Sequence, residues 1–256
     1  MLKRCETMPY GMYIAAAGAH AQSQRLQVLT NNLANADTPG FKRELAVFQA
    51  RHAEAIERGL ESPGSGGMND IGGGVFLAET LTDFSHGTLR QTGNRTDFAI
   101  DGDGFFLVEK EGQQLLTRAG NFQLSNAGEL QTEEGHSVLS AGGEPVTIDR
   151  SLGWDFLENG SISQEGTVIP IALVRPRSNG DLVKAGQNLF SALADVIPVA
   201  NADRRMRHGF LEQSSIKPAT EMMELIETSR AYEANVRMIQ NQDHMIGTLV
   251  NRVLRQ

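Results

Sequence analysis

The sequence has little cysteine and no long apolar run. Its 256 residues include a single cysteine, Cys5, which cannot form an internal disulfide, so the fold has to be stable without one. No stretch approaches the roughly 20 apolar residues that span a bilayer, and we expect no membrane span. With a formal net charge of −8, the chain also lacks the basic surplus typical of nucleic-acid binders. The local cluster Arg204, Arg205 and Arg207 is interpreted as solvated surface.

Motifs that carry chemistry are also missing. The six histidines show none of the spacings that place several metal ligands on one face, and no phosphate-binding glycine pattern lies between a strand and a helix. Asp101-Gly102-Asp103-Gly104 resembles the start of a calcium loop, but a strand-like Phe105-Phe106 follows, which favours a tight turn. We therefore predict no catalytic residue, no metal and no cofactor. A remote alternative is an extracellular carbohydrate-active β protein with a carboxylate pair.

Both ends of the chain have the periodicity of a helical seam. Helices are predicted over 10–35 and 218–254, because apolar or small residues recur there at alternating steps of three and four. Thr38-Pro39-Gly40 ends the first helix, and Pro218 suits the first turn of the second. The first seam is Met12, Ala15, Ala19, Gln22, Leu26, Leu29 and Leu33. The second is Met222, Leu225, Ser229, Tyr232, Val236, Ile239, Asp243, Ile246, Val250 and Val253.

The composition of these seams leaves two interpretations open. Small and polar members such as Ala19 and Asp243 mean that the two helices alone would bury little apolar surface. They either pack on the rest of the chain as ordinary core helices or form an assembly interface completed by neighbouring chains. The residues expected to carry that interface are Leu26, Leu29, Leu33, Leu225, Tyr232, Val236, Ile239, Ile246 and Val250.

The sequence pattern in the middle of the chain predicts antiparallel strands. Gly104, Gly112, Gly120 and Gly128 punctuate short apolar runs, a spacing typical of hairpins. The expected strands are 98–100, 105–108, 115–118, 122–124, 138–139 and a group around 168–174. The expected fold is thus mainly β with terminal α-helices, which pair as a coiled-coil-like module.

The predicted organisation has three parts: a helical module of 10–35 plus 218–254, a partly flexible connector over 36–75, and a β-rich domain over 76–217. The glycine-rich stretch 59–74 has too little apolar surface to pack. The stretch 48–58 looks helical, and its composition permits a continued helix, a separate helix or a segment ordered only by neighbours.

Three motifs resemble the flagellar rod and hook proteins, across nearly the whole chain. The first runs from Asn31 to Lys42, and the second from Phe98 to Phe106. The third includes Leu211 to Ile216 and Arg230 to Glu233. The matching residues are Asn31, Asn32, Leu33, Ala34, Asn35, Thr38, Gly40, Phe41, Asp101, Gly102, Gly104, Phe105, Phe106, Arg230, Ala231, Tyr232 and Glu233.

This resemblance implies a structural subunit of the bacterial flagellar basal-body rod, proximal or distal, with a hook or hook-junction subunit as the alternative. It implies that the terminal helices of many copies form an axial tube and that a discontinuous antiparallel β domain forms the outer layer. The implied partners are copies of itself, other axial proteins of the rod and hook, and the flagellar type III export apparatus. The implied location is the rod in the periplasm, reached without a cleaved secretory signal.

Overall fold

The computed structural model describes residues 10–52, 56, 58–60, 62, 72–157, 160–200 and 203–253. The chain divides into two compact units. Unit 1 comprises residues 1–34, 44–83 and 217–256, and unit 2 comprises residues 35–43 and 84–216. Cys5 and most of the glycine-rich stretch predicted at 59–74 lie outside the described residues.

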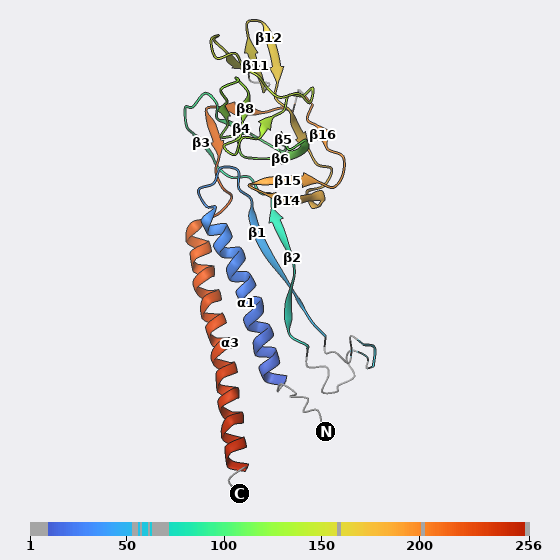
Figure 1. Cartoon of the computed structure of the whole chain (residues 1–256), viewed down its shortest axis with the longest axis vertical. Coiled ribbons are helices and arrows are strands. Elements are labelled where there is room, and N and C mark those ends of the chain that lie inside the picture. The colour runs from blue at the N-terminus through green and yellow to red at the C-terminus, as the bar shows by residue number, and fades with distance from the viewer. Residues whose placement is uncertain are drawn as a thin grey trace. The chain divides into compact units, whose positions relative to one another are not determined.

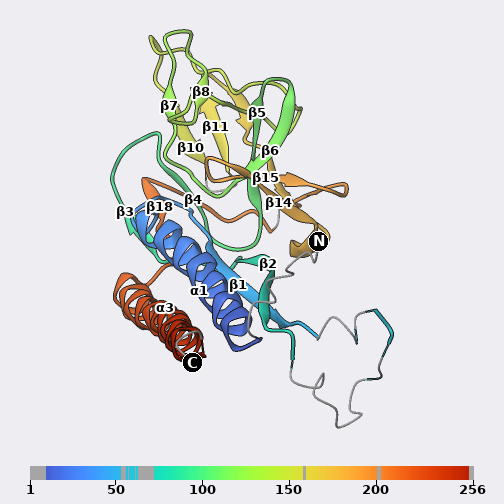
Figure 2. The ribbon, with the colours of Figure 1, turned by 60° about the horizontal axis from the view of Figure 1, so that its bottom comes forward.

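Two helices dominate unit 1. Helix α1 (Tyr10–Ala34) and helix α3 (Pro218–Val253) lie side by side (Figures 1 and 2). Both predicted boundaries and the pairing of the terminal helices are confirmed, since α1 ends just before Asn35 and α3 begins at Pro218, where a missing N–H does no harm. Neither helix is long and apolar enough over its described residues to cross a membrane.

Unit 1 also contains a two-stranded ribbon. Strand β1 (Arg43–Ala50) pairs with strand β2 (Val75–Asp83), and β2 contacts α1. A helical reading of the stretch 48–58 is therefore wrong for residues 48–50. Local composition could not show this, because the strand depends on a partner more than 20 residues away that satisfies its backbone hydrogen bonds. Residues 53–55 and 57 lie outside the described residues.

Unit 2 is built from short, mostly antiparallel strands. Its main sheet has nine strands, seven of them in the order β14-β15-β6-β5-β9-β8-β7, while β13 joins through β5 and β16 pairs with β13. Smaller sheets are β10-β11-β12, β17-β4 and β18-β3. The strands of unit 2 are β3 (Leu89–Gln91), β4 (Phe98–Ile100), β5 (Phe105–Lys110), β6 (Gln113–Thr117), β7 (Gln123–Leu124), β8 (Leu130–Gln131), β9 (Ser137–Val138), β10 (Asp155–Leu157), β11 (Ser161–Gln164), β12 (Thr167–Pro170), β13 (Leu173–Arg175), β14 (Leu182–Gly186), β15 (Leu189–Ala192), β16 (Ile197–Pro198), β17 (Met206–His208) and β18 (Phe210–Glu212), with a short 3-10 helix η2 (Asn179–Asp181) before β14.

The central hairpin β5–β6 confirms the hairpin prediction. Its two-residue turn, Glu111-Gly112, has positive φ angles of 51° and 79°, the backbone that matches the twist of paired strands. Strands are also present at the other predicted places, with boundaries shifted by a few residues. Asp101 to Gly104 forms the turn between β4 and β5, as the sequence predicted.

The apolar side chains of unit 2 form two clusters, one on each face of its central strands. Successive side chains of a strand point to opposite faces, so Phe106 and Val108 join the larger cluster while Phe105 joins the smaller one. Leu115 and Leu116 of β6 divide in the same way. Because the central strands are buried on both faces, their sequences are continuous apolar runs and do not alternate between apolar and polar residues.

Candidate assembly interface

The contact between α1 and α3 contains polar residues at steps of seven. Gly11 and Gly18 of α1 leave room for amide side chains of α3: a Cβ at Gly11 would lie 2.8 Å from Gln242 Nε2, and one at Gly18 would lie 3.1 Å from Asn235 Oδ1. The pairing runs antiparallel, because the lower-numbered end of α1 meets the higher-numbered part of α3. Small residues thus let the helices approach closely, and amides fill the space.

Asn32 lies at the other end of the contact between α1 and α3, near the start of α3. Its side chain is fully buried, and it pairs with the backbone of Glu44: Nδ2 donates to the carbonyl (2.9 Å), and Oδ1 accepts from the N–H (3.0 Å). Nδ2 also lies 3.4 Å from Oε2 of the buried Glu221. One amide therefore connects α1, the start of the β1–β2 ribbon and α3, which explains why this polar residue is buried.

The predicted interface residues differ in how exposed they are. Leu29 is buried, Tyr232 and Val250 are exposed, and the remaining ones are half-buried: Leu26, Leu33, Leu225, Val236, Ile239 and Ile246. Sequence reasoning missed polar residues of α3 that lie against α1, namely Glu221, Asn235 and Gln242, because it followed apolar side chains; the buried Thr228 belongs to the same series. Their exact repeat of seven residues was the available signal.

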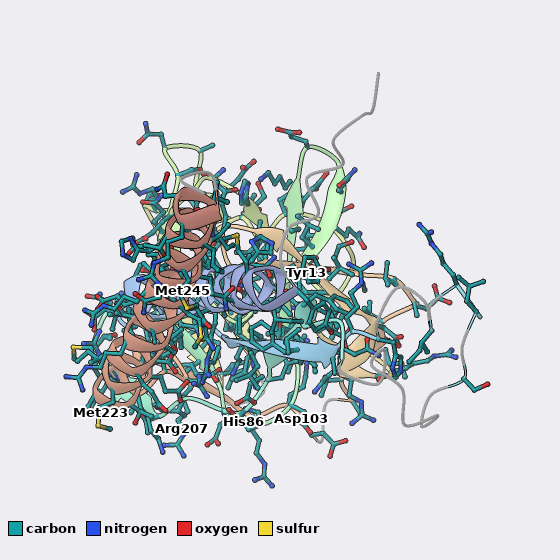
Figure 3. All side chains as sticks on the ribbon, turned by 90° about the horizontal axis from the view of Figure 1, so that it is seen from below. Tyr13, His86, Asp103, Arg207, Met223 and Met245 are labelled. Atoms are coloured by element: carbon teal, nitrogen blue, oxygen red, sulfur yellow. The ribbon has the colours of Figure 1, made fainter. Side chains whose placement is uncertain are left out.

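A second face of α3 exposes large apolar side chains. Met238 is 53% exposed, Met245 57% and Leu249 63%, and Met223 and Ile226 continue this exposure toward the start of the helix. A shallow groove of about 620 Å³ follows the same face and is lined by Arg230, Glu233, Ala234, Arg237, Met238, Asn241, Gln242 and Met245. Met223 and Met245 are labelled on α3 in Figure 3. We call Met223, Ile226, Met238, Met245 and Leu249 the outer face of α3.

Unit 2 contains a buried ion pair between Lys42 and Glu212. Lys42 Nζ lies 2.7 Å from Glu212 Oε1, and both side chains are 1% exposed. The ammonium also donates to the carbonyl of Ser85 (2.8 Å), and the backbone N–H of Gly87 donates to Glu212 Oε1 (2.9 Å). Two charges this deep are tolerated because each has hydrogen-bond partners in addition to the opposite charge.

Arg118 extends this buried network. Its Nε lies 3.5 Å from Glu212 Oε2, while its terminal nitrogen donates to the carbonyl of Gly102 (2.6 Å) and contacts His86 Nδ1 (2.7 Å). Desolvation lowers the pKa of Arg118, and the charges of Glu212 and Asp103 oppose that shift. The guanidinium stays charged, because the ordinary pKa of arginine lies far above neutrality.

Gly40 lies against the backbone of this arginine. Its φ is +67°, and a Cβ there would overlap the carbonyl group of Arg118, so only glycine fits. The Gly40 N–H donates to the carbonyl of Glu212 (2.8 Å), and the Ser215 N–H donates to the carbonyl of Phe41 (3.1 Å). The segment that leaves α1 is thereby bonded to the segment that leads into α3.

Three protein-family models match parts of the chain. "Flagella basal body rod protein" covers residues 12–42, "Flagellar hook protein FlgE/F/G D1 domain" covers residues 99–169, and "Flagellar basal body rod FlgEFG protein C-terminal" covers residues 207–252. The flagellar basal-body rod protein FlgF of Caulobacter vibrioides is 32% identical, over 96% of this chain and 98% of its own length.

Two proteins named FlgG match the chain with similar identity and coverage. The flagellar basal-body rod protein FlgG of Buchnera aphidicola is 31% identical over 93% of this chain and 97% of its own length, and that of Borreliella burgdorferi is 31% identical over 97% and 100%. The chain belongs to the flagellar basal-body rod protein family. The predicted resemblance is thus confirmed.

The matched regions of this rod-family chain meet in unit 2. Lys42 is the last residue of the first matched region, and Glu212 lies in the third, so the buried ion pair connects two matched regions through residues 170 positions apart. The other motif residues divide between buried and exposed positions. Gly40, Phe41, Gly104, Phe105 and Phe106 are buried; Asn35, Thr38, Asp101 and Ala231 are half-buried; Asn31, Ala34, Gly102, Arg230 and Glu233 are exposed.

Proposed function

We propose that the chain is a structural subunit of the bacterial flagellar basal-body rod, which polymerises through α1 and α3 into the axial tube that transmits torque and conducts exported subunits. The observation that carries this proposal is the outer face of α3, together with membership of the rod family. Exposed methionine, isoleucine and leucine side chains gathered on one helix are typical of a protein interface, and methionine adapts well to neighbouring surfaces.

The interface has two parts in this proposal. The seam within one chain holds α1 and α3 together through Asn32, Asn235 and Gln242, and the outer face of α3 packs against helices of neighbouring subunits. Tyr232 and Val250 are exposed, so they are the predicted interface residues most available to a neighbour. Fully burying a large apolar side chain contributes about 1.5–3 kcal/mol, so even partial burial of five such residues would favour association.

The finer assignments are part of the same proposal. Residues 10–35 and 218–254 form the helical assembly module, residues 36–75 the connector and residues 76–217 the outer β-rich domain. The partners are other copies of the chain, further axial proteins of the rod and hook, and the type III export apparatus. The subunit acts in the periplasm, reaches it without a cleaved secretory signal and has a structural, non-enzymatic role.

A pair of substitutions on neighbouring positions of α3 tests the outer face. Met238→Glu places a charge on the proposed interface, and Gln240→Glu places the same charge on another exposed position of the same helix. Both variants should keep the melting temperature of the isolated chain within a few degrees, because both sites are exposed. Met238→Glu should remove most of the chain from purified basal bodies and abolish motility, whereas Gln240→Glu should not.

Equal recovery of both variants would contradict the proposal that this face is an interface. Gold labelling of a tagged chain in purified basal bodies addresses the position along the axis. Label on the rod supports the assignment, and label confined to the hook would favour the hook alternative.

A further inference from the structure

Unit 2 has an arginine-lined groove that the helix assembly does not use. Its volume is about 650 Å³, and it is lined by Asp101, Phe156, Arg204, Arg205, Met206, Arg207, His208 and Phe210. Phe156 and His208 stack with ring centroids 5.5 Å apart, and Arg207 lies over the ring of Phe210 at 5.8 Å. We call this surface the arginine groove; Arg207 is labelled in Figure 3.

The three arginines of the groove differ in how their charge is satisfied. Arg207 pairs with a single carboxylate oxygen of Asp101: its Nη2 and Nε lie 2.8 and 2.9 Å from Oδ2. Arg204 is only 7% exposed, so its interpretation as solvated surface is wrong; it donates to the carbonyl of Ile171, and its Nε is buried without a hydrogen-bond partner. Arg205 is exposed, and its side chain has no partner within the described part of the chain.

This arrangement favours an acidic partner. Three guanidinium groups lie within four residues of the chain, and among the described residues only that of Arg207 pairs with a carboxylate, the one of Asp101. Arginine binds carboxylates in planar, often bidentate geometry, and aromatic walls suit the apolar stems of glutamate side chains. A groove with two guanidinium groups that pair with no carboxylate among the described residues is therefore complementary to a cluster of carboxylates.

The same unit carries such a cluster at the far end of its central strand. Glu109 and Glu111 flank the end of β5, and Glu133 and Glu134 lie in the turn before β9, which pairs with β5. Lys110 Nζ and His136 Nε2 both contact Oε1 of Gln187, at 2.7 and 3.4 Å, which shows that the two turns are neighbours. We call Glu109, Glu111, Glu133 and Glu134 the acidic end.

The groove and the acidic end lie at different places on unit 2. Asp101 precedes the first residue of β5, whereas Glu111 follows its last, and a six-residue strand spans roughly 17 Å. One copy therefore cannot fill its own groove with its own acidic end through a local contact. A contact between the groove of one copy and the acidic end of the next is heterologous, and such contacts build rings or helical filaments.

We propose that the arginine groove binds the acidic end of a second copy of this chain and forms a lateral contact between the β domains of neighbouring subunits. This inference rests on the proposed function, because it requires copies of the chain to lie side by side. Arg205 is the central contact, since it is exposed and unpaired. The net negative charge of the chain makes another copy a suitable partner for a local basic groove.

Charge reversal at both sides of the contact tests this proposal. Arg205→Glu and Glu134→Arg should each lower the amount of chain in purified basal bodies by about tenfold, since each places like charges in contact. The double variant should restore most of that loss. Arg177→Glu, which reverses an exposed arginine of unit 2 outside the groove, should have no effect. Equal melting temperatures of the isolated variants show that the fold is unaffected.

A cysteine pair identifies the partner. In a Cys5→Ser background, a chain with Arg205→Cys and Glu134→Cys should give cross-linked multimers of itself upon oxidation of basal bodies. Full recovery of the single variants, no restoration by the double variant, or a cross-link to a protein of another mass would each overturn the inference. Absence of the unmodified chain from basal bodies would overturn the proposed function as well. If the unmodified chain is present and the charge-reversal variants are recovered in the same amount, only the lateral contact is refuted.

Discussion

Removing the carboxylate of Glu212 should destabilise unit 2 strongly. In Glu212→Ala, Lys42 loses the carboxylate that lies 2.7 Å from its Nζ and the Gly87 N–H loses its acceptor, while Arg118 loses a buried negative charge. Breaking a buried ion pair by removing one partner costs about 3–5 kcal/mol, because the other charge stays buried without compensation. In a unit of this size, the loss lowers the melting temperature by roughly 10 °C.

Calorimetry and urea unfolding of the full chain measure this effect. The matched control is Asp101→Ala, which removes the carboxylate of an exposed arginine pair and should cost less than about 1 kcal/mol. A double variant, Lys42→Met with Glu212→Leu, replaces the pair by apolar side chains and should recover part of the loss. If Glu212→Ala lost no more stability than the control, the reasoning about the buried pair would be refuted.

Three further predictions concern the helix seam and one surface carboxylate. Gly247→Ala should raise the free energy of unfolding by up to about 1 kcal/mol, because alanine favours the helix and the added methyl group meets open space. Gly18→Ala should not raise it, because its methyl group would press against Asn235 of α3; urea unfolding measures both values. Asn32→Ala should cost about 2–3 kcal/mol, because it removes two hydrogen bonds between the buried Asn32 side chain and the backbone of Glu44; an unchanged melting temperature would contradict this. Hydrogen bonds from Ser151 lower the pKa of Asp149, so this carboxylate stabilises the fold above its ordinary pKa of about 3.9 and less as pH falls through the lowered value. Ser151→Ala should raise that pKa in an NMR titration.

The sequence by itself determined the elements whose signals are local. Periodicity placed both terminal helices to within one or two residues, since a helix forms from neighbours along the chain and Pro218 and Thr38-Pro39-Gly40 mark its limits. Glycine spacing located the hairpins, because Gly112 supplies a backbone that other residues rarely adopt. The motif residues identified the family.

Tertiary structure alone decided which polar residues are buried. Asn32, Lys42 and Glu212 look like surface residues in the sequence, and they are buried because partners distant along the chain satisfy their hydrogen bonds and charges. For the same reason the strand β1 was not predicted, since its partner β2 lies beyond a long connecting segment. The apolar periodicity alone also could not separate the face of α3 that contacts α1 from its outer face, because both contain apolar side chains and the position of the second helix distinguishes them.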